Sequence, residues 1–422
     1  YAPFGSYDVK ITTDAEQRIG GTGELMKPEK YWERGQEIAP GVFRYQYRSG
    51  SDDRRTWHFK AQDVHNFAWG ADPDYIHTRM QGPDSLKLHF YYLKKDRETW
   101  EQLPDYTRRF FAYMNDHFGA YLYPQFSVIQ GGDGGMEYPM CTMLKGTGEL
   151  EGLVGVMAHE GAHNWYYGML ATNENSHPWM DEGFTSYAEE EVLNSFRDTP
   201  RVNAHLGAYR NHQYVVEKGE LSPLATGADF YAKNLRYGVN AYSRGELYLN
   251  QLRYILGDEV FQKGILQYYQ RWKLRHPGPG DFLRVLEKVS DLHLDWYNQF
   301  WVETTHLIDY GIRSVEEQGD STFLRLEKLE EMPMPLRLKI TTRDGKIHRY
   351  YIPTLMQMGA PEEEGLKVAK EWPWTHPMYR LILPFPLRAI ESMVIDPEAR
   401  MADINRANNV YPRQENQDGE EE

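Results

Sequence analysis

Hydrophobic and polar residues alternate near the beginning of the chain. Residues 7–12 and 57–61 follow a period of two, which is typical of strands with one buried face. Between them, Gly20-Gly21 and the run 49–53 carry the small and polar residues of turns. We therefore expect a small β region over residues 1–70.

The middle of the chain has a mixed pattern. Residues 86–92 and 126–129 are strand-like. Apolar residues then recur at helical spacing after residue 104, and further helices are expected over 151–170, from Met180 onward and up to residue 305. Asp281 is expected to be the N-cap of one of these helices.

After residue 311 the period of two returns. Residues 336–340 and 347–352 flank Asp344-Gly345, which is a strong hairpin signal. Residues 381–383 and 393–395 are expected to extend the same sheet. From residue 406 the chain is polar, so 406–422 is expected to be a disordered acidic tail.

These patterns predict a multidomain α+β protein, because 422 residues exceed one ordinary core. The expected division is a β domain over 1–70, a mixed domain over 71–310, a small β-sandwich over 311–405 and the tail over 406–422.

Composition narrows the classes of function. The net charge of −15 argues against nucleic-acid binding, because no basic surplus is available to neutralise phosphates. The charge fits a cationic partner, such as a free peptide N-terminus, while solubility is the more ordinary cause of such a charge. The single cysteine, Cys141, excludes an internal disulfide.

The chain contains no apolar run of about 18 residues, so no membrane span is expected. It also lacks a signal peptide and opens at Tyr1, which suggests a processed or truncated chain. A soluble protein of the cytoplasm or periplasm is expected, and neither the compartment nor the oligomeric state follows from the sequence.

The most informative stretch is His159-Glu160-Gly161-Ala162-His163, which reads H-E-x-x-H. Residues four apart share a helix face, so both histidines can hold one metal ion, with Glu160 beside it. Glu182 follows His163 after eighteen intervening residues, a spacing that lets a second helix supply a third ligand. Two imidazoles, one carboxylate and an open position predict one catalytic Zn²⁺ per chain rather than a structural site. A helix with surface histidines is the alternative.

With these residues in place, the sequence resembles the aminopeptidase N family of gluzincin zinc metallopeptidases, as a bacterial-type member truncated at its N-terminus. The family signature is H-E-x-x-H, eighteen residues and Glu. Residues 134–137 match the first four positions of the exopeptidase motif G-x-M-E-N, with Tyr138 in place of Asn. Residues 179–184 match W-x-x-E-G-F, and 242–245 resemble Y-x-K-G with Arg244 for Lys.

The resemblance implies a thermolysin-like catalytic domain between a partial N-terminal β-saddle domain and a C-terminal β domain. Glu160 is then the general base that takes a proton from the metal-bound water and returns it to the leaving amine. Tyr242 is expected to donate a hydrogen bond to the tetrahedral oxyanion. Tyr237 is either a second pocket tyrosine or a structural residue.

Glu137 is expected to pair with the α-ammonium group of a peptide. This pairing favours exopeptidases, because a substrate without a free N-terminus leaves a buried carboxylate unpaired. Gly134 and Gly135 belong to the same motif, and Met136 and Tyr138 are expected to line the pocket for the first side chain. In the family an upstream residue of the β-saddle domain also holds the amine, and it would precede Tyr1.

Other residues invite weaker interpretations. His177 is not expected to be a ligand, because three protein ligands suffice, and Cys141 is expected to be a buried, inert thiol. Asp181 and Glu189 either orient the ligands or are solvated. Arg244 either contacts the substrate or, as we expect, lies on a helix surface.

The sequence thus predicts a zinc aminopeptidase that hydrolyses the N-terminal bond of peptides. The alternatives are a gluzincin endopeptidase, an inactive peptide-binding homologue and, more distantly, a hydrolase of lipid epoxides.

Overall fold

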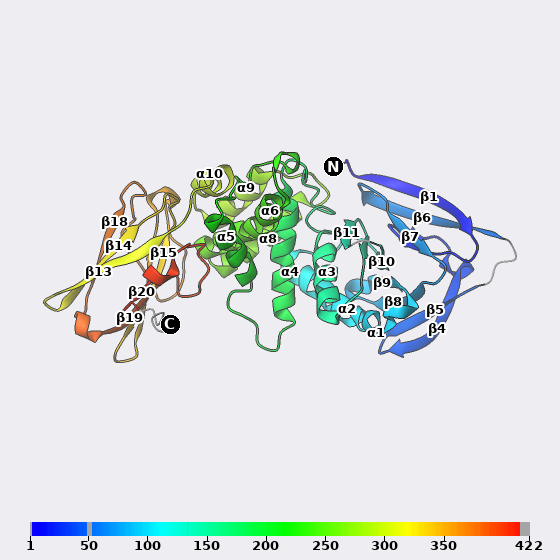
Figure 1. The fold of residues 1–422 in the computed structure, drawn as a ribbon, viewed down its shortest axis with the longest axis horizontal. Helices are drawn as coiled ribbons and strands as arrows, with labels where there is room; N and C mark the ends of the chain where they lie inside the picture. Colours follow the sequence, from blue (N-terminus) through cyan, green and yellow to red (C-terminus); the bar gives the residue numbers. More distant parts are fainter. Residues whose placement is uncertain (1, 49–52, 133, 414–422) are drawn as a thin grey trace, which may run out of the picture. The chain divides into compact units, whose positions relative to one another are not determined.

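The computed structural model describes residues 2–48, 53–132 and 134–413. The chain divides into two compact units (Figure 1). The first comprises Tyr1–Ala204, Gly227–Asp229 and Ile265–Pro279, and the second comprises His205–Thr226, Phe230–Gly264 and Gly280–Glu422. Both sheets and helices occur in each unit, which confirms the α+β class.

A seven-stranded mixed sheet is the centre of the first unit. Its order is β11-β12-β10-β9-β8-β5-β4, where the strands are β4 (Trp32–Ala39), β5 (Val42–Tyr47), β8 (Ile76–Gln81), β9 (Lys87–Tyr92), β10 (Gln125–Gln130), β11 (Gly135–Tyr138) and β12 (Cys141–Leu144). Strand β10 is parallel to β9 and β12 and is buried along its whole length. Its side chains are accordingly either apolar or hydrogen-bonded. The strands expected at 86–92 and 126–129 are confirmed. Because β5 pairs with β8, the predicted division at residue 70 falls inside one sheet.

Smaller sheets complete the β part of this unit. Strands β1 (Gly5–Asp14), β6 (Arg54–Val64) and β3 (Glu24–Leu25) form one sheet, and β2 (Arg18–Gly21) pairs with β7 (Trp69–Asp72). The alternation at 7–12 and 57–61 is confirmed by the pairing of β1 with β6, and Trp57 and Phe59 point into an aromatic core.

Helices of the first unit cover the seven-stranded sheet. They are α1 (Arg97–Trp100), α2 (Leu103–Phe118), α3 (Leu150–Ala162), the π-helix η4 (Trp179–Gly183) and α4 (Phe184–Ser195). The apolar face predicted after residue 104 is buried in α2. Helix α3 packs against α2, α4, β11 and β12, so it lies between the sheet edge and the next helix (Figure 1).

The prediction that one helix runs over 151–170 is wrong, because α3 ends at Ala162. Beyond it, the backbone amides of Gly168, Met169 and Leu170 bond to carbonyls five residues earlier. Tyr167 has φ 131°, a value that no α-helix accommodates. The aromatic residues after His163 are buried by this irregular turn, which no simple periodicity reveals.

The second unit contains the remaining helices, in part shared with the first along α8. They are α5 (Leu206–Glu217), α6 (Asn234–Gly238), the π-helix η6 (Val239–Arg244), α7 (Gly245–Leu256), α8 (Asp258–Trp272), α9 (Pro279–Ser290) and α10 (Asp295–Glu303). Asp281 is not an N-cap as expected: α9 begins at Pro279, and Asp281 lies in its first turn with an ion pair to Arg284.

Two sheets form the C-terminal part of this unit. One has the order β13 (Tyr310–Gln318), β14 (Ser321–Lys328), β18 (Met378–Leu383); the other has β17 (Leu366–Val368), β16 (Ile347–Ile352), β15 (Leu336–Thr342), β19 (Ile390–Ile395), β20 (Val410–Tyr411). The hairpin at Asp344-Gly345 is confirmed, with Gly345 at φ 82°. Residues 381–383 do not extend this sheet as predicted, because β18 pairs with β14.

The predicted disorder of 406–422 is wrong for its first part. Residues 406–408 form a 3-10 turn, and β20 pairs with β19, so this segment is ordered because backbone pairing and two buried asparagines hold it. Residues 414–422 lie outside the described residues. Since the second unit joins helices to both β-sheets, the division at residue 310 falls inside it, and the separate domains over 1–70, 71–310 and 311–405 stay a prediction.

Short 3-10 turns connect these elements: η1 (Pro28–Lys30), η2 (Pro83–Ser85), η3 (Lys94–Asp96), η5 (Ala228–Phe230), η7 (Leu355–Gln357), η8 (Leu387–Ala389) and η9 (Arg406–Asn408). No helix in the described part of the chain combines the length and apolar character that crossing a membrane requires.

Candidate metal centre

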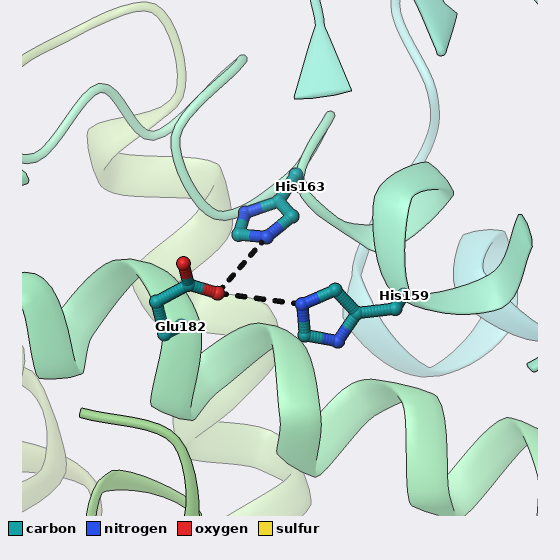
Figure 2. Close-up of side chains that lie close together, drawn as sticks. All are labelled: His159, His163 and Glu182. Carbon is teal, nitrogen blue, oxygen red and sulfur yellow. Dashed lines mark hydrogen bonds and ion pairs between the residues drawn. The ribbon is translucent and has the colours of Figure 1, made fainter. Parts of the chain in front are cut away.

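Helix α3 places His159 and His163 one turn apart, and η4 brings Glu182 to them. The Oε2 atom of Glu182 lies 3.3 Å from Nε2 of His159 and 3.3 Å from Nε2 of His163. Figure 2 shows both imidazoles and the carboxylate pointing toward one another. The three side chains predicted as ligands from their spacing are therefore brought together, as a group that could hold a metal ion.

The other ring nitrogens of the two histidines face carboxylates. Nδ1 of His159 lies 2.8 Å from Oε2 of Glu189, and Nδ1 of His163 lies 2.8 Å from Oδ1 of Asp181. A carboxylate only accepts hydrogen bonds, so each Nδ1 carries a proton, and each Nε2 presents a lone pair when its ring is neutral. Of the two interpretations of Asp181 and Glu189, orientation of the ligands therefore fits the structure.

This arrangement fits a metal. When both rings are neutral, the two Nε2 lone pairs and the carboxylate oxygen converge at hydrogen-bond distance with no proton between them. A cation shared by these three acceptors, either a proton or a metal ion, offsets the cost of burying them. Nitrogen and oxygen donors of this kind, two histidines and one glutamate, are the ligand set of catalytic zinc sites.

The electrostatics of the group also favour positive charge. Burial lowers the pKa of His159, but hydrogen bonds to Glu182 and Glu189 outweigh it and raise this pKa to about 9. Burial opposes the charge on His163 as well, whereas Asp181 and Glu182 raise its pKa well above the ordinary value. Burial raises the pKa of the Glu182 carboxyl, but hydrogen bonds from His159 and His163 outweigh it and hold this pKa far below its usual range.

A second group of side chains adjoins the first. Oxygen atoms of Glu137 and Glu160 and a ring nitrogen of His163 all lie within 4.8 Å of one another. Burial raises the pKa of Glu160 to about 7, against the lowering influence of the histidines and with a further upward contribution from Glu137. Two carboxylates this close repel each other, so a cation between them is stabilised.

Strand β11 carries Glu137 at the edge of the seven-stranded sheet. Gly135 lies on the same strand face, because a Cβ atom built there would be 2.2 Å from Oε1 of Glu160. A Cβ atom on Gly134 would meet nothing within 4 Å. Gly135 therefore leaves the room that the Glu160 carboxylate occupies.

Met136 and Tyr138 lie on the opposite face of β11, because side chains alternate along a strand. Tyr138 packs against the cluster of Tyr75, Tyr91, Ile129 and Cys141, and Met136 is 44% exposed. The predicted pocket for the first side chain of a substrate stays a prediction for both residues.

Tyr237 and Tyr242 lie in the second unit, on α6 and η6, with their ring centroids 6.3 Å apart. Their approach to the metal-ligand residues of the first unit stays a prediction. The expectation that Arg244 lies on a helix surface is wrong: it is 1% exposed and donates to Asn240 Oδ1 at 2.8 Å and to the Ser222 carbonyl. Its planar guanidinium also lies over the Trp301 ring, which offsets part of the cost of burial.

Two candidate functional residues lie in π-helical turns. Glu182 belongs to η4 and Tyr242 to η6, and each turn continues directly into a regular helix, α4 or α7. Insertions of this kind are rare and occur often at functional sites, because they aim a side chain away from the regular helical position. No pattern in the sequence distinguishes these turns from α-helix.

Sequence reasoning missed two polar residues at the centre. Thr185 places its hydroxyl 3.2 Å from Nδ1 of His163, and Asn164 accepts the backbone amide of Met140 at 2.9 Å, which ties the loop after β11 to the end of α3. Only their position next to ligands could have signalled them. Cys141 is buried with a pKa raised to about 12 by burial, as expected of an inert thiol, and His177 belongs to neither described ligand group.

Comparisons with known proteins agree with this geometry. Residues 105–301, which include His159, His163 and Glu182, match the model of the peptidase family M1 domain. Over these residues the chain is similar to peptidase family M1. Glutamyl aminopeptidase from Sus scrofa is 24% identical to this chain over 251 residues, which cover 54% of this chain and 26% of the relative. Leucine aminopeptidase 2 from Chaetomium globosum is 24% identical over 242 residues, covering 52% and 38%.

The fold extends the likeness beyond the M1 domain. A crystal structure of Legionella pneumophila aminopeptidase A in complex with aspartic acid matches with a TM-score of 0.65 and 11% identity, over 95% of this chain and 44% of that chain. This chain thus spans less than half the length of these proteins. Aminopeptidases of the M1 family are metallopeptidases, so the family implies a bound metal, which the two histidines and Glu182 could hold.

Proposed function

We propose that this chain is a zinc-dependent aminopeptidase that removes the N-terminal residue from peptides. The observation that carries the proposal is the position of Glu182 Oε2, which lies 3.3 Å from Nε2 of both His159 and His163. The carboxylates of Glu137 and Glu160 adjoin this group. The M1 domain over residues 105–301 supports the same activity.

His159, His163 and Glu182 would hold the zinc ion. When bound, Zn²⁺ lowers the pKa of a coordinated water and polarises the carbonyl of the scissile bond. Asp181 and Glu189 keep the Nδ1 protons in place, so that both Nε2 atoms stay available as ligands.

Glu160 is the proposed general base. Burial raises its pKa to about 7, so its carboxylate can accept a proton from water near neutral pH and then give it to the departing amine nitrogen. Gly135 leaves this carboxylate the space that a larger residue would take.

Glu137 is proposed to bind the substrate's α-ammonium group. Its carboxylate adjoins that of Glu160, and an ammonium group between them removes their mutual repulsion. A peptide without this cation would leave Glu137 desolvated and unpaired, which costs several kcal/mol. This preference for a free N-terminus separates the proposal from an endopeptidase.

Strand β11 is a suitable edge for an extended substrate. Among the described residues it pairs with β12 alone, so its outer backbone groups face away from the sheet. A peptide that pairs with these groups would be held beside Glu137 and Glu160. Tyr242 is proposed, by resemblance, to donate to the developing oxyanion.

The test is metal analysis together with Glu160→Gln. Purified protein should contain about one zinc per chain, and Glu160→Gln should retain the metal while losing at least about a hundredfold in kcat on an aminoacyl anilide. Glu151→Gln, at an exposed position of the same helix, is the matched control and should keep full activity. Protein without stoichiometric metal, or an active Glu160→Gln, would contradict the proposal.

A further inference from the structure

A second cavity lies in the first unit, between the seven-stranded sheet and the β1-β6-β3 sheet. It contains about 500 Å³ of empty space, which includes its open mouth. None of its lining residues belongs to the metal centre. Its floor is formed by polar residues of β8, β9 and β10, and its walls by apolar residues that include Leu25, Trp32 and Phe59.

Arg79 is the unpaired cation of this cavity. Its guanidinium forms no hydrogen bond or ion pair with another residue in the described part of the chain, whereas the other lysine or arginine of the lining, Lys87, is held by Glu24 at 2.7 Å. Arg79 is directly opposite His89 in the antiparallel pairing of β8 with β9, so both side chains lie on one face of the sheet.

A chain of hydrogen bonds fixes which ring nitrogen of His89 carries a proton. Within the described residues, the hydroxyl of Tyr47 has only Nδ1 of His77 as a partner, at 3.3 Å, and donation to this nitrogen is the arrangement that leaves its O–H paired. Nε2 of His77 then carries the proton and donates to Nδ1 of His89, at 2.9 Å. The remaining nitrogen of His89, Nε2, must carry a proton as well, and His89 lines the cavity beside Arg79.

Both histidines remain neutral in this arrangement. Burial, together with the neighbouring Arg79 and Lys87, lowers the pKa of His89 to about 3. Burial likewise lowers the pKa of His77, with contributions from His89 and Arg79. His89 therefore acts as a neutral donor at physiological pH, and Arg79 supplies the charge.

Two further polar residues of the floor, Gln125 and Ser127, are already occupied. The amide nitrogen of Gln125 donates to the carbonyls of Gly21, Gly23 and Met140, and the hydroxyl of Ser127 donates to the amide oxygen of Gln125. A guest thus meets the Arg79 guanidinium, the N–H donor of His89, the side chain of Tyr91, the Lys87–Glu24 ion pair and apolar walls. We propose that this cavity binds a small carboxylic acid with a short apolar tail, whose carboxylate lies on Arg79 and His89 and whose tail packs against Leu25, Trp32 and Phe59.

Calorimetric titration with pentanoate tests this assignment, with uncharged pentanamide as the matched ligand. Wild-type protein should bind pentanoate saturably in the millimolar range or tighter, and pentanamide at least about tenfold more weakly, because a guanidinium favours a charged acceptor. Absence of saturable pentanoate binding, or equal binding of the amide, would overturn the proposal.

Variants locate the binding. Arg79→Gln should weaken pentanoate binding at least about tenfold, whereas Arg34→Gln, at an exposed position of the same unit, should leave it unchanged. Carboxylate bound instead at the metal centre would be unaffected by Arg79→Gln, and that result contradicts the proposal. Leu25→Trp keeps every charge and fills the cavity, so it should also abolish binding; retained binding would refute the site even if Arg79→Gln fails to fold.

An N-acetylated dipeptide with a C-terminal leucine distinguishes a free acid from a peptide terminus. Only about 70 Å³ of the cavity is open to the centres of water-sized spheres, which favours pentanoate over this dipeptide. Tighter binding of the dipeptide, lost in Arg79→Gln, would reassign the cavity to peptide C-termini.

Discussion

Each imidazole of the metal centre is held between two carboxylates. Glu182 faces Nε2 of both rings, while Glu189 and Asp181 hold the Nδ1 atoms of His159 and His163. The ligands could be predicted from spacing, since H-E-x-x-H fixes one helix face. The partners of Nδ1 could be proposed only as alternatives, because their contact depends on how α3 and α4 pack.

Asp181→Asn should reduce zinc affinity about 10- to 100-fold, because the amide supports the Nδ1 proton of His163 less strongly than a carboxylate does. Competition with a chromogenic chelator measures this change. Asp198→Asn, at an exposed position beyond α4, should leave the affinity unaltered. If both variants bind zinc as tightly as the wild type, Asp181 has no role in holding the ligand.

Gly135→Ala should lower kcat at least about tenfold, because its Cβ would lie 2.2 Å from Oε1 of Glu160 and displace that carboxylate. Gly132→Ala is the matched control: its Cβ meets nothing within 4 Å, and activity should stay within about twofold. Steady-state kinetics on an aminoacyl anilide compare the two. Equal activity of both variants would show that Glu160 tolerates the intrusion.

At the scale of elements, strands were more predictable than the ends of helices. The alternation of apolar and polar residues correctly predicted which face of β1, β6 and β15 is more buried, because successive side chains of a strand point to opposite faces. The early end of α3 could not be predicted, since the segment after it pairs with a distant residue, Leu170 with Arg275. The π-helical turns η4 and η6 carry no sequence pattern that distinguishes them from α-helix. Likewise β18 joins β14 through contacts between residues far apart in the chain.

Gly345→Ala should destabilise the second unit by about 1 kcal/mol, because Gly345 has φ 82°, which an L-residue adopts at a cost. Gly207→Ala, in α5 of the same unit, meets no atom within 4 Å and should leave stability unchanged or slightly higher. Urea unfolding followed by circular dichroism gives both values. If Gly345→Ala had the same free energy of unfolding as the wild type, that result would be inconsistent with the φ of 82° at Gly345.

At the scale of the whole molecule, composition narrowed the expected classes of function more than it predicted the architecture. The negative charge excluded nucleic acid as the expected partner, and length indicated several domains. The two compact units cut across the divisions drawn at residues 70 and 310, because β4 and β5 join the seven-stranded sheet and the helices after Ala204 join the C-terminal sheets. Such pairing between distant segments has no local sequence signal.

Asp403 should make the stability of the protein depend on pH. Burial raises its folded-state pKa from 3.8 to about 6, although amides of Tyr310 and Asn405 oppose this. The folded state therefore binds the proton more tightly, so the contribution is stabilising below about pH 4 and is lost as pH rises through 6. When the pH is lowered from 7 to 4, the free energy of unfolding of the wild type should increase by about 2 kcal/mol relative to that of Asp403→Asn.

Urea titrations of both proteins at the two pH values measure this difference. A constant gap between wild type and Asp403→Asn would mean that Asp403 is ionised throughout the range.

The central claim is that one site both holds a metal and recognises a free amino terminus. Its most direct test compares kcat/KM for leucine anilide and N-acetyl-leucine anilide with the zinc-loaded protein. We predict at least about a hundredfold preference for the free amine, and loss of that preference in Glu137→Gln, because only the free amine pairs with Glu137. Cleavage of the acetylated compound at a comparable rate would contradict the account.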